Sequence, residues 1–167
     1  MKKLLIIAAL LAVSFQLSAQ KIGYMNTETI LSKIPSYTAA KEKLDALNSQ
    51  YKAKVESEYK VIEQMYNKYQ SSKASLNEYQ RSQKENEIIN KEKAAKELQK
   101  SYFGQDGYMQ KKTDELLSPI KERVQNAINQ LAKQEGYSLI IDLAAAQGII
   151  YNNKQQDLSQ KIINMLK

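Results

Sequence analysis

The sequence contains no cysteine and no histidine. Without cysteine the chain can form neither a disulfide nor a lipoprotein anchor, even in an oxidising compartment. The two missing residue types are also the commonest general base and the strongest side-chain nucleophile of enzymes. We therefore expect no catalytic residue, no metal site and no cofactor.

Long apolar runs are equally scarce, and the one run of ten residues, Leu4–Val13, lies near the N-terminus. It follows Lys2 and Lys3 and precedes the small residue Ala19, which is the pattern of a cleaved secretory signal. A membrane anchor is the alternative, but a bilayer requires about 20 apolar residues. We expect residues 1–19 to be removed and the exported chain to be soluble.

Charge of one sign is not concentrated anywhere in the chain. The net charge is +7 and the pI is about 9.3, yet residues 36–118 carry 15 basic and 13 acidic residues. A nucleic-acid-binding protein would show a basic stripe, so we expect no nucleic-acid partner. The net positive charge favours acidic partners only weakly.

Glycine and proline are absent between Pro35 and Gly104, and helix-forming residues fill that stretch. Apolar side chains recur in it at spacings of three and four, which indicates a helix with one buried or partner-facing stripe. The first half of the stripe is Leu44, Leu47, Tyr51, Val55, Tyr59, Ile62, Tyr66 and Tyr69, and the second half includes Ile88, Ala95, Leu98, Tyr102 and Met109.

This pattern falters after residue 70, and Ser75 and Glu78 then fit a capping box. We predict a long helical hairpin over residues 36–118, with its tip near residues 71–76. An outgoing helix of about 35 residues extends about 50 Å, at 1.5 Å per residue.

Three residues disturb the return helix. Gly104 and Gly107 interrupt it as a hinge or a close-packing site, since a phosphate-binding loop would follow a strand. Pro119, after Ser118, either kinks the helix or restarts it. Gly136 is a suitable end for it.

Strand-like sequence is confined to the two ends of the chain. Lys21–Met25 is one short strand, and a brief helix follows over Thr27–Lys33. The side chain of Asn26 or of Thr27 can cap this helix. Ser138–Leu143 and Gly148–Tyr151 have the composition of two buried strands. Asp157 can cap a final helix.

The strand-containing segments, residues 20–35 and 119–167, give a body too small to be stable alone. A core of about 65 residues rarely supplies more than about 3–5 kcal/mol without disulfides, metal or association. We therefore predict an α+β, mostly helical fold whose small body self-associates through its strands. The candidate oligomerisation residues are Ile22, Tyr24, Leu139, Ile140, Ile141, Ile149, Ile150 and Tyr151.

Eight of the eleven tyrosines lie in residues 36–118. One interpretation is an antiparallel coiled-coil seam, although tyrosine packs poorly into the holes of two helices. The other is a contact surface, because tyrosine meets both apolar and polar partners at low entropic cost. The candidate client-binding residues are Tyr51, Tyr59, Ile62, Met65, Tyr66, Tyr69, Tyr79, Tyr102 and Phe103.

Asp142 is the only acidic residue inside a predicted strand. A carboxylate at such a position usually accepts hydrogen bonds from backbone N–H groups. We expect that structural role for Asp142 rather than a catalytic one.

Taken in order, three segments of the sequence resemble the Skp/OmpH family of periplasmic chaperones of outer-membrane proteins. They are the strand motif K-I-G-Y-M-N at Lys21–Asn26, the run from Phe103 to Ile120 that begins F-G-Q-D-G, and L-I-I-D at Leu139–Asp142 with Ile150 and Tyr151. The resemblance extends over the whole chain after the signal, and the helices match in period and composition.

The resemblance implies a homotrimer in which strands of all three chains form a central barrel. It also implies three helical hairpins around a cavity, and ATP-independent holding of unfolded outer-membrane proteins in the periplasm. A weak contact with a membrane surface or lipopolysaccharide belongs to the same expectation, with little electrostatic contribution from nearly neutral helices. A non-catalytic coiled-coil scaffold of the envelope with one fixed partner is the alternative.

Overall fold

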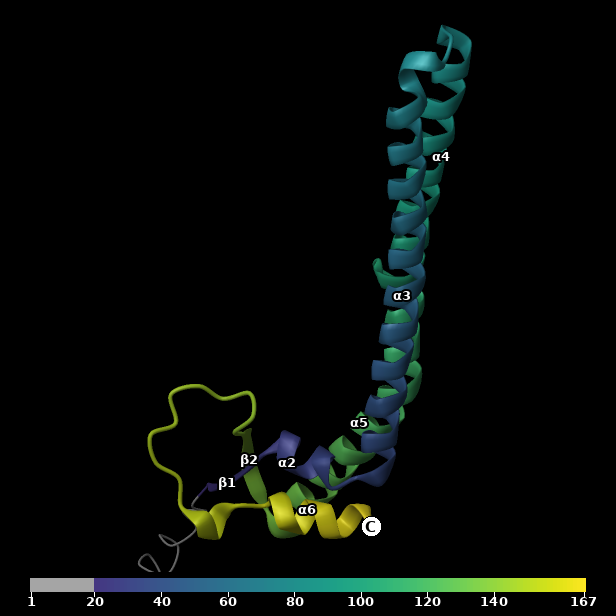
Figure 1. Ribbon diagram of the computed structural model, residues 1–167. Helices are drawn as coiled ribbons and strands as arrows, with labels where there is room; N and C mark the ends of the chain where they lie inside the picture. Colours follow the sequence, from purple (N-terminus) through teal and green to yellow (C-terminus); the bar gives the residue numbers. More distant parts are fainter. Residues whose placement is uncertain (1–19) are drawn as a thin grey trace, which may run out of the picture. The chain divides into compact units, whose positions relative to one another are not determined.

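The computed structural model describes residues 20–167 (Figure 1). The predicted signal at residues 1–19 lies outside the described residues. Contacts divide the described chain into two units, which we call the arm, residues 34–123, and the body, residues 20–33 with 124–167. Helix α5 is shared between them, because it begins in the arm and ends in the body.

In the arm, α3 (Pro35–Ser72) and α4 (Glu78–Phe103) form the predicted hairpin (Figure 1). Pro35 occupies the first turn of α3, where its fixed φ suits the helix and its missing N–H leaves no bond unmade. Lys91 pairs with Glu58 across the two helices at 2.7 Å. The buried residues between the helices are Ile62, Tyr69, Ile88 and Ala95, with Met65 and Leu76 packed against them.

The tip lies where it was predicted, because a 3₁₀ turn, η2 (Lys73–Ser75), joins α3 to α4. The predicted capping box of Ser75 and Glu78 is wrong. Asn77 caps α4 instead: its side chain accepts from the Gln80 N–H at 2.9 Å, and the Gln80 side chain accepts from the Asn77 N–H at 3.0 Å. Ser75 is part of the 3₁₀ turn, and its hydroxyl donates to a carbonyl of the preceding turn.

The return helix is interrupted as predicted, since α4 ends before Gly104 and α5 (Tyr108–Glu135) begins after Gly107. Pro119 lies inside α5, and the helix does not restart there. Gly136 has a φ of 72°, the left-handed conformation that ends helices, and β2 begins at the next residue.

In the body, β1 (Lys21–Met25) and β2 (Tyr137–Asp142) pair in parallel, with Ile22 opposite Leu139. The other edge of β1 is also occupied, because the Leu158 N–H donates to the Tyr24 carbonyl at 2.8 Å. The outer edge of β2 pairs with no strand among residues 20–167.

The predicted strand at Gly148–Tyr151 is wrong. This segment belongs to a long loop between β2 and the 3₁₀ turn η3 (Lys154–Gln156), and it has no strand partner within the described chain (Figure 1). Because β2 and the residues around Asp157 already occupy the two edges of β1, this segment cannot pair with β1. The Ile150 side chain is 100% exposed.

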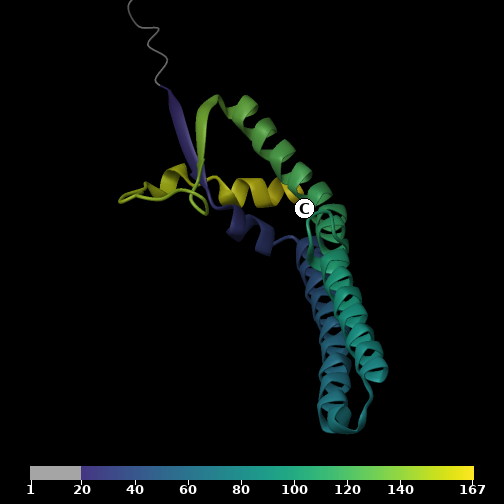
Figure 2. The ribbon, with the colours of Figure 1, turned by 90° about the horizontal axis from the view of Figure 1, so that it is seen from above.

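Two short helices, α2 (Thr27–Ser32) and α6 (Ser159–Leu166), pack against each other in the body (Figure 2). The Asn26 side chain caps α2, in line with the prediction. The Asp157 carboxylate accepts from the first N–H of α6 at 2.9 Å. The most deeply buried side chains of this core are Ile30, Leu158 and Ile162.

Candidate functional site

An aromatic cluster, formed by Tyr51, Tyr102, Phe103 and Tyr108, lies where α4 gives way to α5. The Tyr51 and Tyr102 rings stack at 4.2 Å between centroids and 6° between planes. The Tyr108 ring lies 5.9 Å from Tyr102, and Phe103 meets Tyr102 edge-on at 6.3 Å. Stacked and edge-to-face aromatic pairs each add about 0.5–1.5 kcal/mol beyond their burial, so the cluster fastens the interrupted return helix to α3.

The interruption itself is built by close backbone packing. A Cβ on Gly107 would lie 2.9 Å from the Gly104 carbonyl oxygen, and Asp106 has a φ of 60°. The structure thus shows the close-packing alternative that the sequence left open for the two glycines. A side chain at Gly107 would force the loop apart.

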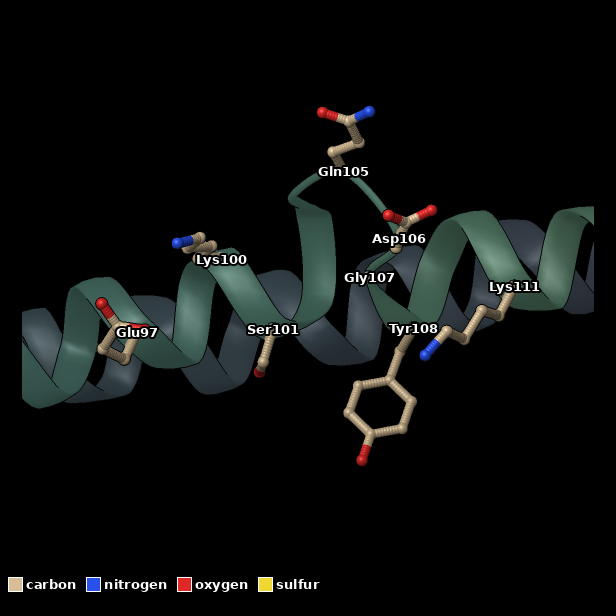
Figure 3. A pocket seen from close by; sticks show the side chains of 8 residues that line it. All are labelled: Glu97, Lys100, Ser101, Gln105, Asp106, Gly107, Tyr108 and Lys111. Atoms are coloured by element: carbon tan, nitrogen blue, oxygen red, sulfur yellow. The ribbon is translucent and has the colours of Figure 1, made fainter.

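A depression of about 370 Å³ lies beside this interruption (Figure 3). Two ammonium groups, Lys100 and Lys111, and two carboxylates, Glu97 and Asp106, line it. The opposite charges balance, so the depression has no clear preference for an anionic or a cationic ligand. The remaining lining residues are Ser101, Gln105, Gly107 and Tyr108.

Three of the nine candidate client-binding residues lie in the seam of the hairpin. Ile62 and Tyr69 are buried and Met65 is half-buried. The expectation that tyrosine fits such a seam poorly is wrong for Tyr69, because its hydroxyl donates to the Glu85 carboxylate at the seam's edge. That hydrogen bond, together with burial, raises the pKa of the Tyr69 hydroxyl.

Four other candidates are exposed on the arm: Tyr59, Tyr66, Tyr79 and Phe103. The Tyr79 side chain is 73% exposed near the tip. Tyr51 and Tyr102 are half-buried within the aromatic cluster. Sequence reasoning missed Ile89, which is 45% exposed, although its position one residue beyond buried Ile88 could have indicated it.

The candidate oligomerisation residues gather on the body around β1, β2 and the long loop. Five of the eight are exposed, namely Ile22, Leu139, Ile149, Ile150 and Tyr151. Tyr24 is buried and Ile140 and Ile141 are half-buried. A depression of about 180 Å³ is lined by residues of both strands and of the loop, including Ile22, Ile141, Ile149 and Tyr151.

Asp142 has the predicted structural role. Its carboxylate accepts from the N–H and hydroxyl of Thr27 and from the Ala144 N–H, so it ties the end of β2 to the start of α2. Burial raises the pKa of this carboxyl, but the hydrogen bonds from Thr27 and Ala144 outweigh burial and hold the pKa below its ordinary value.

A second charged group joins three elements of the body. The Glu135 carboxylate at the end of α5 binds the Lys161 ammonium at 2.7 Å and the Lys21 ammonium at 3.4 Å. The hydrogen bond from Lys161 lowers the pKa of Glu135 and raises that of Lys161. These ion pairs are partly exposed, so each contributes little to stability.

Residues 20–167 contain no group of three or more acidic side chains that could hold a metal ion. Within the same residues, no helix combines the length and the apolar character needed to cross a bilayer.

Residues 21–166 match the family model described as outer membrane protein (OmpH-like). Over its whole length the chain is similar to two proteins named chaperone protein Skp, covering each completely. It is 25% identical to the one from Yersinia enterocolitica and 26% identical to the one from Photorhabdus laumondii.

The fold is also similar to a solved structure. The match is to a chain described as an OmpH-like outer membrane chaperone from Caulobacter crescentus CB15, with a TM-score of 0.67. The alignment covers 89% of this chain and 85% of that one, at 13% identity, so it supports the shared fold alone.

Proposed function

Because the chain belongs to the OmpH-like outer membrane protein family, we propose that it is an ATP-independent periplasmic holdase for unfolded outer-membrane proteins. The observation that carries this proposal is the full-length similarity to proteins named chaperone protein Skp. The exposed tyrosines of the arm support it, because their amphipathic rings can make weak contacts with both the apolar and the polar groups of many clients.

The body would assemble three copies of the chain. Five exposed apolar side chains around one sheet support self-association, because large apolar side chains that gather on a surface usually mark an interaction site. The free edge of β2 and the unpaired segment Gly148–Tyr151 are further support, since open edges pair with other chains. Three arms around one cavity would then hold a client by avidity rather than by one tight site.

The proposed periplasmic location agrees with the predicted signal and with the proposed clients. Residues 1–19 have the sequence of a cleaved secretory signal, and the proposed clients pass through the periplasm on their way to the outer membrane. Loss of the signal leaves 148 residues with a net charge of +5, which attracts acidic surfaces such as lipopolysaccharide or a membrane only weakly.

The client contacts are proposed for the exposed side chains Tyr59, Tyr66, Tyr79 and Phe103, with Tyr51 and Tyr102 at the aromatic cluster. Buried Ile62 and Tyr69, and half-buried Met65, would keep the two helices together and reach a client only if the hairpin opened.

An aggregation assay tests the function. A urea-unfolded outer-membrane β-barrel protein is diluted into buffer with the mature chain and without nucleotide, and scattered light is followed. The proposal predicts that a molar excess of trimer suppresses scattering, with serum albumin as the control. Unchanged scattering would contradict the holdase function and favour the fixed-partner scaffold.

A further inference from the structure

The exposed apolar side chains of the arm are unevenly distributed around the hairpin. Two grooves lie on either side of the buried contact between Tyr69 and Ile88. The rim of one groove carries Tyr66 and Ile89, which are 51% and 45% exposed. The rim of the other carries the charged residues Lys68, Lys84 and Glu87, together with half-buried Met65 and Leu76.

Exposed side chains at seven-residue steps extend the surface of the first groove along the arm. Tyr59 precedes Tyr66 by seven residues, and Phe103 follows Ile89 by fourteen. Steps of seven return to the same side of a helix in a coiled coil, so these exposed side chains form two lines along one flank. We call this surface the tyrosine flank.

A hydrogen bond confirms that the two lines share one flank. The Tyr59 hydroxyl donates to the Gln99 side chain at 3.3 Å. Gln99 follows Glu92 by seven residues, and Glu92 lines the same groove as Tyr66. The Tyr59–Tyr66 line on α3 therefore faces the Glu92–Gln99 line on α4 over about two turns, and Ile89 lies beside the latter in the same groove.

The tyrosine flank is acidic, although the arm as a whole is slightly basic. Glu85 and Glu92 line its groove. Gln70 also lines the groove, and two carboxylates precede it on the same side of α3 by seven and fourteen residues, namely Glu63 and Glu56. These four carboxylates are Glu56, Glu63, Glu85 and Glu92. Three ammonium groups oppose them on the flank: Lys73 in the groove, Lys96 in the line of Ile89 and Lys52 in the line of Tyr59.

The opposite flank has the reverse character. Lys68 lines its groove, and the same helical line carries Val61 and Lys54 at seven-residue steps. Val61 is the exposed large apolar side chain of that line, at 38%. The hairpin therefore presents an aromatic, acidic flank and a more polar, lysine-bearing one.

We propose that the tyrosine flank is the face of the arm that recognises clients, and that it selects unfolded segments whose apolar side chains are interspersed with lysine or arginine. Tyrosine rings accept both apolar groups and cations, and the four carboxylates complement the positive charges. This inference rests on the proposed holdase function and names the client chemistry of that same site. Because each exposed ion pair is weak, the preference comes from their sum and decreases with salt.

Peptide binding tests the charge preference. Two fluorescent unstructured peptides share the same leucines and phenylalanines, and one carries lysines where the other carries glutamates. The lysine peptide should bind the mature protein about tenfold more tightly at low salt, with the ratio falling towards one at about 0.5 M salt. Equal binding of the two peptides at low salt would overturn the preference.

Paired variants test the flank. Tyr66→Ser combined with Ile89→Ser removes apolar contact from the tyrosine flank at half-exposed positions, so the hairpin should still fold, as circular dichroism can check. This variant should bind the lysine peptide about tenfold more weakly, whereas Val61→Ser on the opposite flank should change binding less than about twofold. Equal losses in the two variants would overturn the assignment to one flank.

Replacing charge alone separates the two parts of the proposal. Glu63→Gln with Glu92→Gln should reduce the preference for the lysine peptide, while Glu87→Gln on the opposite flank should leave it unchanged. The aggregation assay is run on the same samples. Suppression of aggregation without any peptide preference removes this inference alone, whereas failure to suppress aggregation removes the holdase function itself.

Discussion

The arm and the body differ in where their apolar side chains lie. In the arm, the stripes of α3 and α4 close against each other around Ile62, Tyr69 and Ile88. In the body, Ile30 and Ile162 are fully buried, whereas several strand and loop side chains stay exposed. Two long helices can satisfy each other within one chain, whereas a two-stranded sheet cannot cover both of its faces and its outer edge. The comparison supports the proposal that the body self-associates, whereas the arm closes its apolar stripes within one chain.

The largest expected effect comes from placing a charge on the exposed apolar surface of the body, which tests whether the body differs from the arm in needing other copies. Ile150→Asp should reduce the mass measured by light scattering from that of the proposed trimer to that of one chain, because an unpaired carboxylate is costly inside an interface. Ile150 is fully exposed in the single chain, so the monomer should keep its helical content. Asn152→Asp adds the same charge to the same loop and serves as the control. A trimeric Ile150→Asp protein would show that the loop lies outside the interface.

The next effect concerns how the body is held together within one chain. Asp142→Ala removes the acceptor of three hydrogen bonds from Thr27 and Ala144. We expect a loss of about 2–3 kcal/mol in the free energy of unfolding, measured by urea at fixed protomer concentration. Asp114→Ala, on an exposed surface of α5, is the matched control and should change this free energy by less than about 0.5 kcal/mol.

The pH dependence of the same variant sharpens that result. The folded-state pKa of Asp142 is lowered, so its stabilisation is complete above the unfolded pKa of about 3.9 and is lost as pH falls through the folded value. Wild type and Asp142→Ala should therefore converge in stability below about pH 4. A constant difference down to acidic pH would show that the charge of Asp142 contributes nothing.

A smaller effect probes the closed stripe of the arm. Tyr69→Phe removes the hydroxyl that donates to the Glu85 carboxylate and keeps the buried ring. The expected loss is about 1.5 kcal/mol in the free energy of unfolding, the lower end for hydrogen bonds to charged groups, because Glu85 stays hydrated. Tyr66→Phe, at an exposed ring one turn earlier, should change this free energy by less than about 0.3 kcal/mol. Equal effects of the two variants would mean that the hydrogen bond is not formed in solution.

The smallest effect lies at the tip of the hairpin. Asn77→Ala removes the side-chain cap of α4 and should reduce the free energy of unfolding by about 0.5–1 kcal/mol. Ser75→Ala, two residues earlier, should leave it nearly unchanged, since the Ser75 hydroxyl donates to the Ser72 carbonyl and caps no N–H of α4. The reverse order in thermal melting would restore the capping box that the sequence suggested.

Much of the arm could be predicted because its signals are local. The apolar period and the absence of glycine and proline before Gly104 predict the hairpin, and the polar residues near position 75 predict its tip. The pair Gly104 and Gly107 predicts the interruption before Tyr108. The identity of the cap could not be predicted, because Ser75 and Asn77 both suit that position. The choice depends on where the 3₁₀ turn ends.

The body was harder to predict because strands depend on distant partners. Gly148–Tyr151 has the composition of a buried strand, yet in one chain both edges of β1 are filled by β2 and by the residues around Asp157. Composition also could not show which arm residues share a flank, because that depends on how α3 and α4 are rotated about each other. The hydrogen bond between Tyr59 and Gln99 provides that information.

The parallel pairing of β1 with β2 has a consequence for the order of folding. Lys21 and Ser138, which hydrogen-bond at the start of this pairing, are 117 residues apart in the chain. A chain delivered from its N-terminus therefore presents β1 long before β2 exists. The local helices form within about a microsecond, whereas distant strand pairing is slow. A hairpin that closes first shortens the effective loop between the two strands, so the arm acts as a folding aid for the body of its own chain before it meets any other protein.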